Sequence, residues 1–109
     1  MREMTLREVC NMLGLTRRAV QCYEKEGLVI SSGKNKYGYL LYNEVAIKRI
    51  REIKMYRDFG FGIKDIKVLF AAEKEEYVEL MTSRLEKMKK EWIELESNIE
   101  RIEKLIHNK

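Results

Sequence analysis

Two adjacent arginines, Arg17 and Arg18, are the residues in this sequence with the clearest chemical potential. They follow Thr16, a residue type that caps helices by accepting a hydrogen bond from a backbone N–H, so both arginines are predicted to lie in the first turn of a helix. Arginine can make two hydrogen bonds to one guanine in the major groove, and Gln21, one turn further on, suits adenine or a phosphate. Because arginine pairs also occur on ordinary solvated helix faces, these residues suggest duplex DNA as a ligand without deciding it.

A second basic group lies in the polar, glycine-containing segment 31–38 and just beyond it. The residues that combine charge with aromatic rings there are Lys34, Lys36, Tyr37 and Tyr39. Lysines at a hairpin tip would contact backbone phosphates and supply affinity that depends on salt but not on base sequence. The alternative is an ordinary hairpin whose tyrosines serve the core, and for Tyr42 we expect that core role.

Three further side chains are candidates for phosphate contacts. Tyr23 can reach a phosphate with its hydroxyl while its ring packs against the domain. Arg57 and Lys64 flank a break at Gly60–Gly62 and could add contacts from a second pair of helices.

Helix-capping residues, and glycines that end helices, predict the elements that position these side chains. Thr5 and Glu8 have the form of a capping box, and Gly14 stands where the helix that they begin should stop. The helix after Thr16 is predicted to end at Gly27. Two short helices joined by a glycine-containing turn form a helix-turn-helix, whose second helix would carry the arginine pair.

The segments 28–30 and 39–42 are predicted as the two strands of a hairpin, or wing, with the basic residues at its tip. Asn43 is predicted to cap a long amphipathic helix that runs to about Phe59 and directs Ala46, Ile50 and Ile53 inward. A short fourth helix follows the glycine break, and it contains Ile63, Ile66, Leu69 and Phe70.

From about Glu76 the apolar residues recur at alternating steps of three and four. They are Val78, Met81, Leu85, Met88, Trp92, Leu95, Ile99, Ile102 and Ile106. The pattern spans about four heptads, or roughly 45 Å of helix at 1.5 Å per residue. A helix folded back on its own domain is the alternative, but the strict period favours a coiled coil with a second chain.

The flanking charges bear on the orientation of that coiled coil. A parallel pair would set Arg84 against Lys89, and Glu91 against Glu96, and both contacts join like charges. An antiparallel pair centred near Trp92 sets Lys89 against Glu96 twice, although it leaves Glu91 near its own copy. Each exposed pair contributes only a few tenths of a kcal/mol. Together these contacts favour an antiparallel homodimer. The apolar residues from Val78 to Ile106 then form the interface, and the basic N-terminal parts of the two copies lie at opposite ends of the coiled coil.

The charge distribution fits a division of the chain into a basic N-terminal part and a C-terminal coiled coil. Residues 1–72 hold 14 Lys and Arg against 8 Asp and Glu, a net charge of +6, whereas residues 73–109 carry −2. No apolar run approaches the roughly 20 residues that span a bilayer, and the start of the chain lacks the apolar stretch of a signal peptide, so we expect a cytoplasmic protein.

The residue types give little support for a metal site, a cofactor or catalysis. Cys10 and Cys22, together with His107, do not form a metal-ligand set, so no metal or cofactor is expected. The two cysteines are predicted to be small buried residues in the reduced state, although Cys22 on the arginine-bearing helix could be sensitive to oxidation. With no catalytic triad and no phosphate-cradling glycine loop, we do not expect an enzyme.

The sequence therefore predicts a mainly α fold in two parts. Residues 1–75 form a winged helix-turn-helix DNA-binding domain, made of helices and a two-stranded β wing, and residues 76–109 form a long dimerisation coiled coil. The alternatives are an architectural DNA-binding protein and a coiled-coil module that binds other proteins.

This combination resembles the mercury-resistance-regulator (MerR) family of bacterial transcription regulators. The stretches that carry the resemblance are Leu15–Val20, Tyr23–Leu28, Gly38-Tyr39 with Tyr42, and Arg57–Phe61. The resemblance implies homodimers with an antiparallel coiled coil that bind palindromic promoter sites and realign the promoter by bending and untwisting it. It leaves open RNA polymerase as a further partner at the promoter. It also implies that Thr16, Arg17, Arg18, Gln21 and Tyr23 belong to the recognition helix, and that Lys34, Lys36, Tyr37 and Tyr39 belong to the wing.

The chain departs from the family pattern at three places. Gln21 and Cys22 stand where arginine and tyrosine are usual, which implies weaker phosphate anchoring or a different operator. Leu40 replaces the usual arginine of the wing, and Gly62 replaces a helix-capping serine or threonine. Because no cysteine follows Cys22, the metal- and redox-sensing types are not expected, and the chain is interpreted as a short member without a separate effector-binding domain. Regulation by no effector, by a protein partner or by a ligand between coiled coil and body all remain open, as do activation and repression.

Overall fold

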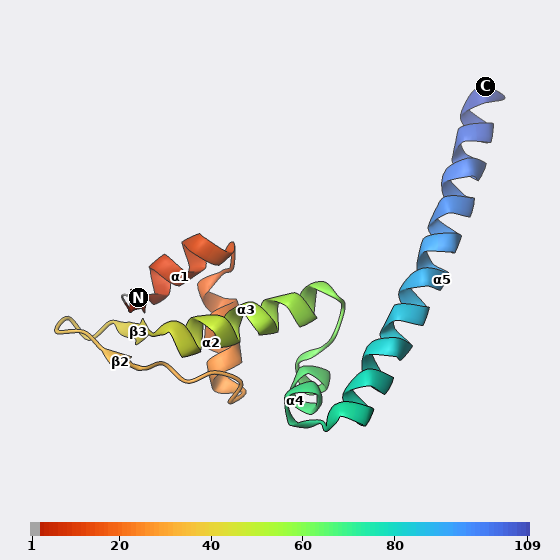
Figure 1. Ribbon diagram of the computed structural model, residues 1–109. Coiled ribbons are helices and arrows are strands. Elements are labelled where there is room, and N and C mark those ends of the chain that lie inside the picture. The colour runs from red at the N-terminus through yellow and green to blue at the C-terminus, as the bar shows by residue number, and fades with distance from the viewer. Residues whose placement is uncertain (1–2) are drawn as a thin grey trace. The chain divides into compact units, whose positions relative to one another are not determined.

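A computed structural model describes residues 3–109, which divide into two compact units, one ending at Phe70 and the other spanning Ala71–Lys109. The fold is mainly α, as predicted (Figure 1). In chain order the elements are β1 (Met4–Thr5), α1 (Leu6–Leu13), α2 (Arg17–Lys25), β2 (Gly33–Lys34), β3 (Leu40–Tyr42), α3 (Glu44–Asp58), α4 (Ile63–Ala71) and α5 (Lys74–His107).

Both helices of the helix-turn-helix begin at the predicted residues, and α1 also ends as predicted. α2 ends at Lys25, two residues before the predicted Gly27, which has a positive φ of 76°. The Thr5 hydroxyl accepts a hydrogen bond from Glu8 N at 3.3 Å, and the Glu8 carboxylate accepts one from Thr5 N at 3.1 Å, which completes the capping box of α1. Gly14 ends α1 in the left-handed conformation at φ 67°, which glycine adopts without steric cost. The Thr16 hydroxyl accepts from Ala19 N at 3.1 Å and so caps α2.

The wing differs from the prediction. The strands form an antiparallel sheet in the order β1-β3-β2, with Met4 opposite Tyr42 and Gly33 opposite Leu41. The predicted strand 28–30 is wrong, because that segment is irregular: Leu28 and Val29 are buried, whereas Ile30 is 82% exposed. For Leu28 and Val29, the apolar character therefore reflects burial and not strand pairing. β1, which sequence reasoning missed, contains only two residues and shows no period.

The core of the first unit is built from its helices and β3. Its most deeply buried large side chains are Val9, Val20, Tyr42, Ile47, Ile50, Ile53 and Ile66. The expected core role of Tyr42 is confirmed: the side chain is fully buried and its hydroxyl donates a hydrogen bond to the Glu24 carboxylate. Burial and this hydrogen bond both raise the pKa of Tyr42 above its ordinary value. The inward positions Ala46, Ile50 and Ile53 of α3 are likewise confirmed.

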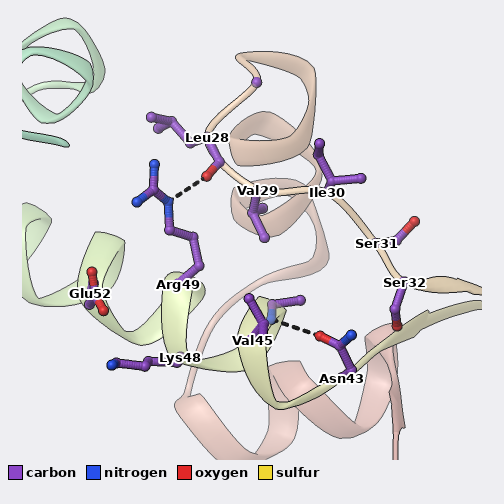
Figure 2. Close-up of a pocket in the computed structure, with 12 residues that line it drawn as sticks. Leu28, Val29, Ile30, Ser31, Ser32, Asn43, Val45, Lys48, Arg49 and Glu52 are labelled. Atoms are coloured by element: carbon purple, nitrogen blue, oxygen red, sulfur yellow. Dashed lines mark hydrogen bonds between the residues drawn. The ribbon is translucent and has the colours of Figure 1, made fainter. Parts of the chain in front are cut away.

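Arg49 ties three segments of the first unit together. Its Nε donates to the Leu28 carbonyl at 2.9 Å, and its guanidinium lies 3.3 Å from the centroid of the Phe70 ring. The segment that contains Leu28 and the first half of α3 border an open pocket of about 680 Å³, where Figure 2 shows the Arg49–Leu28 hydrogen bond. None of the predicted DNA-binding residues lines this pocket.

The second unit is dominated by α5, an uninterrupted helix of 34 residues. None of its residues is buried, and eight of the nine residues of the apolar stripe are between 40% and 66% exposed. Within residues 3–109, no helix combines the length and the apolar character that crossing a membrane requires.

Candidate nucleic-acid interface

The two faces of α2 have opposite characters. Val20 and Tyr23 are buried against the domain, whereas Arg17, Arg18 and Gln21 are exposed. This division follows from the helical period, because residues three or four apart lie on the same face. The cap that the Thr16 hydroxyl provides fixes where the helix begins, and with it the direction in which both arginines leave the backbone. Thr16 thus has a positioning role, whatever contact it makes with DNA.

Two residues of α2 lie differently from what their predicted roles suggest. Tyr23 is only 5% exposed, and burial raises the pKa of its hydroxyl, so any contact with a phosphate is confined to a small part of its surface. Cys22 is exposed, which makes the prediction that both cysteines are buried wrong for this residue. The period that directs Val20 and Tyr23 inward directs Cys22 outward. Cys10 is buried as expected, and burial raises the pKa of its thiol.

The tip of the wing is held by one asparagine. The Asn35 side-chain oxygen accepts hydrogen bonds from Tyr37 N at 2.9 Å and from Tyr39 N at 3.0 Å, and Gly38 adopts a positive φ of 82° in the turn between them. Tyr37 and Tyr39 are exposed, and Lys36 Nζ lies 5.1 Å from the centroid of the Tyr37 ring. The wing therefore presents charge and aromatic surface from a defined turn.

A groove of about 470 Å³ lies where α2 meets the wing. Its lining residues are Thr5, Leu6, Arg7, Arg17, Gln21, Gly38, Tyr39 and Leu40. It brings together three of the predicted DNA-binding residues, Arg17, Gln21 and Tyr39, from α2 and the wing. The other predicted residues do not line it. Sequence reasoning missed Arg7, whose only signal was a basic side chain just after the cap of α1.

Arg57 lies at the end of α3. It is exposed, and its Nη1 donates to the Phe61 carbonyl at 3.1 Å, so it holds the turn between α3 and α4. A contact of Arg57 with DNA stays a prediction.

The basic groups of this surface are not neutralised by neighbouring carboxylates. Within residues 3–109, the side chains that form no ion pair include Arg7, Arg17, Arg18, Lys34 and Lys36. A set of unpaired cations on one helix-turn-helix and its wing attracts a polyanion, because each phosphate that it neutralises releases condensed counterions. Among these same described residues, no group of three or more His, Cys, Asp or Glu is arranged to hold a metal ion.

A helix-turn-helix that presents unpaired arginines beside a basic β wing defines a winged-helix protein that binds DNA. The model of the MerR HTH family of regulatory proteins matches residues 4–73, which is well over half of the chain. The chain therefore belongs to this family of DNA-binding transcriptional regulators.

The similar curated proteins include HTH-type transcriptional regulators. An HTH-type transcriptional regulator of Synechocystis is 26% identical over 102 residues, which cover 94% of this chain and 74% of the relative. The regulator CueR of Escherichia coli is 25% identical over 105 residues, which cover 94% of this chain and 75% of CueR. The nodulation protein NolA of Bradyrhizobium is 29% identical over 66 residues, and this chain spans only 28% of its length.

Solved structures of low sequence identity share the fold. A MerR family regulator from Bacillus cereus superposes with a TM-score of 0.79 at 19% identity, over 94% of this chain and 79% of that one. HiNmlR, a MerR family regulator lacking the sensor domain and bound to promoter DNA, gives a TM-score of 0.73 at 20% identity, over 91% of this chain and 80% of that one.

Proposed function

We propose that the protein acts in the cytoplasm as a homodimer that binds a palindromic promoter site and distorts the DNA between the two half-sites. The observation that carries this proposal is the apolar stripe of α5, which no part of residues 3–109 buries. A contiguous exposed apolar surface of this length marks a protein interface. Two identical units on a two-fold axis then match the symmetry of a palindrome.

The sequence of α5 favours one antiparallel register. In an antiparallel pair each residue at heptad position a packs on a residue at d of the other helix, because the chain directions are reversed. An axis between Ile93 and Glu94 satisfies this rule along nearly the whole stripe. The layers on each side of that axis pair Trp92 with Leu95, Met88 with Ile99, Leu85 with Ile102 and Met81 with Ile106.

The charges favour the same register. Lys89 of each copy then faces Glu96 of the other, and Glu91 faces Asn98 instead of its own copy, which removes the like-charge contact of an axis at Trp92 itself. A shift by one heptad in one direction sets Lys89 and Glu91 against their own copies. A shift in the other direction sets Glu96 against its own copy and leaves fewer apolar layers. Like charges directly opposite one another destabilise such pairs.

Lys89→Glu tests the orientation through the sign of its effect. In the antiparallel register it replaces two attractive contacts by two repulsive ones, so the dimer should weaken by about 1–2 kcal/mol, or roughly 5- to 30-fold in Kd. In a parallel pair it would face Arg84 and strengthen the dimer. Sedimentation equilibrium at low salt measures the dimer Kd. The double variant Lys89→Glu/Glu96→Lys should restore it, and a tighter dimer in the single variant would contradict the antiparallel arrangement.

The proposed function itself is tested by unbiased selection of DNA fragments bound by the full chain. We expect inverted half-sites at a fixed separation, found between the two recognition elements of a promoter, and affinity that falls steeply as salt rises. Enrichment of bent but non-palindromic DNA would instead favour an architectural protein. Weak association that is insensitive to salt would favour a module that binds other proteins.

A further inference from the structure

The groove between α2 and the wing contains a basic residue that belongs to neither element. Arg7 lies in the first turn of α1, is exposed, and lines the same groove as Arg17, Gln21 and Tyr39. We propose that Arg7 binds a backbone phosphate of the DNA in this groove. The proposal rests on duplex DNA being the ligand of the surface, and it adds α1 to the elements that hold the duplex.

The composition of the groove leaves its positive charge to two residues. Among the residues that line it, only Arg7 and Arg17 are charged. Leu40, on the wing side, contributes apolar surface and no hydrogen-bond donor, and Gln21 is neutral. A phosphate that enters the groove therefore meets one guanidinium from α1 and one from α2.

The surroundings of Arg7 leave its guanidinium available. The nearest acidic residue in sequence, Glu8, directs Oε1 to Thr5 N at 3.1 Å and to the Thr5 hydroxyl at 3.2 Å as part of the capping box. Arg7 itself forms no ion pair within residues 3–109. The capping box also fixes the first turn of α1, so the direction of the Arg7 backbone is set before DNA binds.

A phosphate is a better partner for Arg7 than a base edge. Bases are read by residues on the element that enters the major groove, which is α2 here, whereas residues on the elements beside it contact the backbone and set the register of the protein on the duplex. Arg7 lies on α1, and its groove opens between the recognition helix and the wing. A contact of this kind carries charge but no sequence preference.

The experiment compares Arg7→Gln with Arg51→Gln in the full chain. Arg51 is an exposed arginine of α3 that does not line the groove, so both variants lose the same charge. Affinity is measured by fluorescence anisotropy for the selected site and for an unrelated duplex, at several salt concentrations. Circular dichroism verifies that both variants keep the helix content of the unchanged protein.

We expect Arg7→Gln to weaken binding to both duplexes by the same factor. The magnitude of the negative slope of log K against log salt should decrease by about 0.9 for each copy. When salt is raised from about 50 to 200 mM, the dimer of the variant should therefore lose roughly tenfold less affinity than the dimer of the unchanged protein loses. Arg51→Gln should leave the slope nearly unchanged. Because Leu40 lines the same groove, Arg7→Gln/Leu40→Arg should recover most of the slope.

The outcomes separate this inference from the proposed function. Equal behaviour of the Arg7 and Arg51 variants would overturn the phosphate contact while the unchanged protein still binds its site. Loss confined to the selected site would also overturn it, because that pattern belongs to a base contact. Failure of the unchanged protein to bind any duplex would refute the proposed function as well.

Discussion

Replacing Trp92 by aspartate is expected to convert the dimer to monomers. In the proposed register Trp92 lies in the layer next to the two-fold axis, so the substitution acts twice in each dimer. Removing a large aromatic side chain from a packed interior costs about 3–5 kcal/mol, and a buried carboxylate without a partner adds to that. A total above about 6 kcal/mol raises the dimer Kd by more than roughly 10⁴-fold. Sedimentation velocity at micromolar concentrations measures the change.

The matched control for Trp92→Asp is Ile93→Asp. Ile93 is adjacent in sequence and 63% exposed, but it lies outside the apolar stripe, so this variant should remain dimeric. Its behaviour separates loss of the interface from a general effect of a new charge on α5. Dimers that persist with aspartate at position 92 would contradict the heptad assignment.

The second large effect is expected at the recognition helix. Arg18→Ala should reduce affinity for the selected site by about 1–3 kcal/mol per half-site, or roughly 5- to 150-fold, because a bidentate contact to guanine is lost. Affinity for unrelated duplexes should change much less, since a base contact contributes little there. Electrophoretic mobility shifts with the selected site, and with the same site altered at single base pairs, identify the position that Arg18 reads.

Lys25→Ala is the control for Arg18→Ala. Lys25 is an exposed cation in the last turn of the same helix, so both variants remove one positive charge from α2. If Arg18→Ala leaves the affinity and the base preference unchanged, the assignment of this residue as a reader of base sequence is wrong.

The sequence predicted the helices well because their ends depend on local chemistry. Thr5, Thr16 and Asn43 each cap the helix that follows through a hydrogen bond between residues three apart, and Gly14 ends its helix by adopting a conformation that other residues rarely reach. Signals of this kind need no knowledge of the rest of the fold. The heptad stripe is local in the same sense.

The features that the sequence did not predict depend on contacts between distant segments. Whether Leu28–Ile30 forms a strand depends on where β3 finds its partners, and β3 is already paired with β1 and with β2. Arg7 joins the groove only because α1 packs beside α2 and the wing, which its position in the sequence does not reveal.

In the proposed dimer, the unbroken length of α5 would set the distance between the two half-sites of the operator. The 34 residues of α5 contain neither glycine nor proline. In the proposed dimer, the first unit of each copy is attached at the start of its α5. The distance between these two attachment points therefore changes only with the number of residues in the helix. Deleting one heptad between the first unit and the two-fold axis keeps the stripe on one face. With the register about the axis unchanged, it shortens that distance by about 21 Å, at 1.5 Å per residue in each copy. Relatives whose rods differ by whole heptads would accordingly recognise half-sites that are spaced in discrete steps.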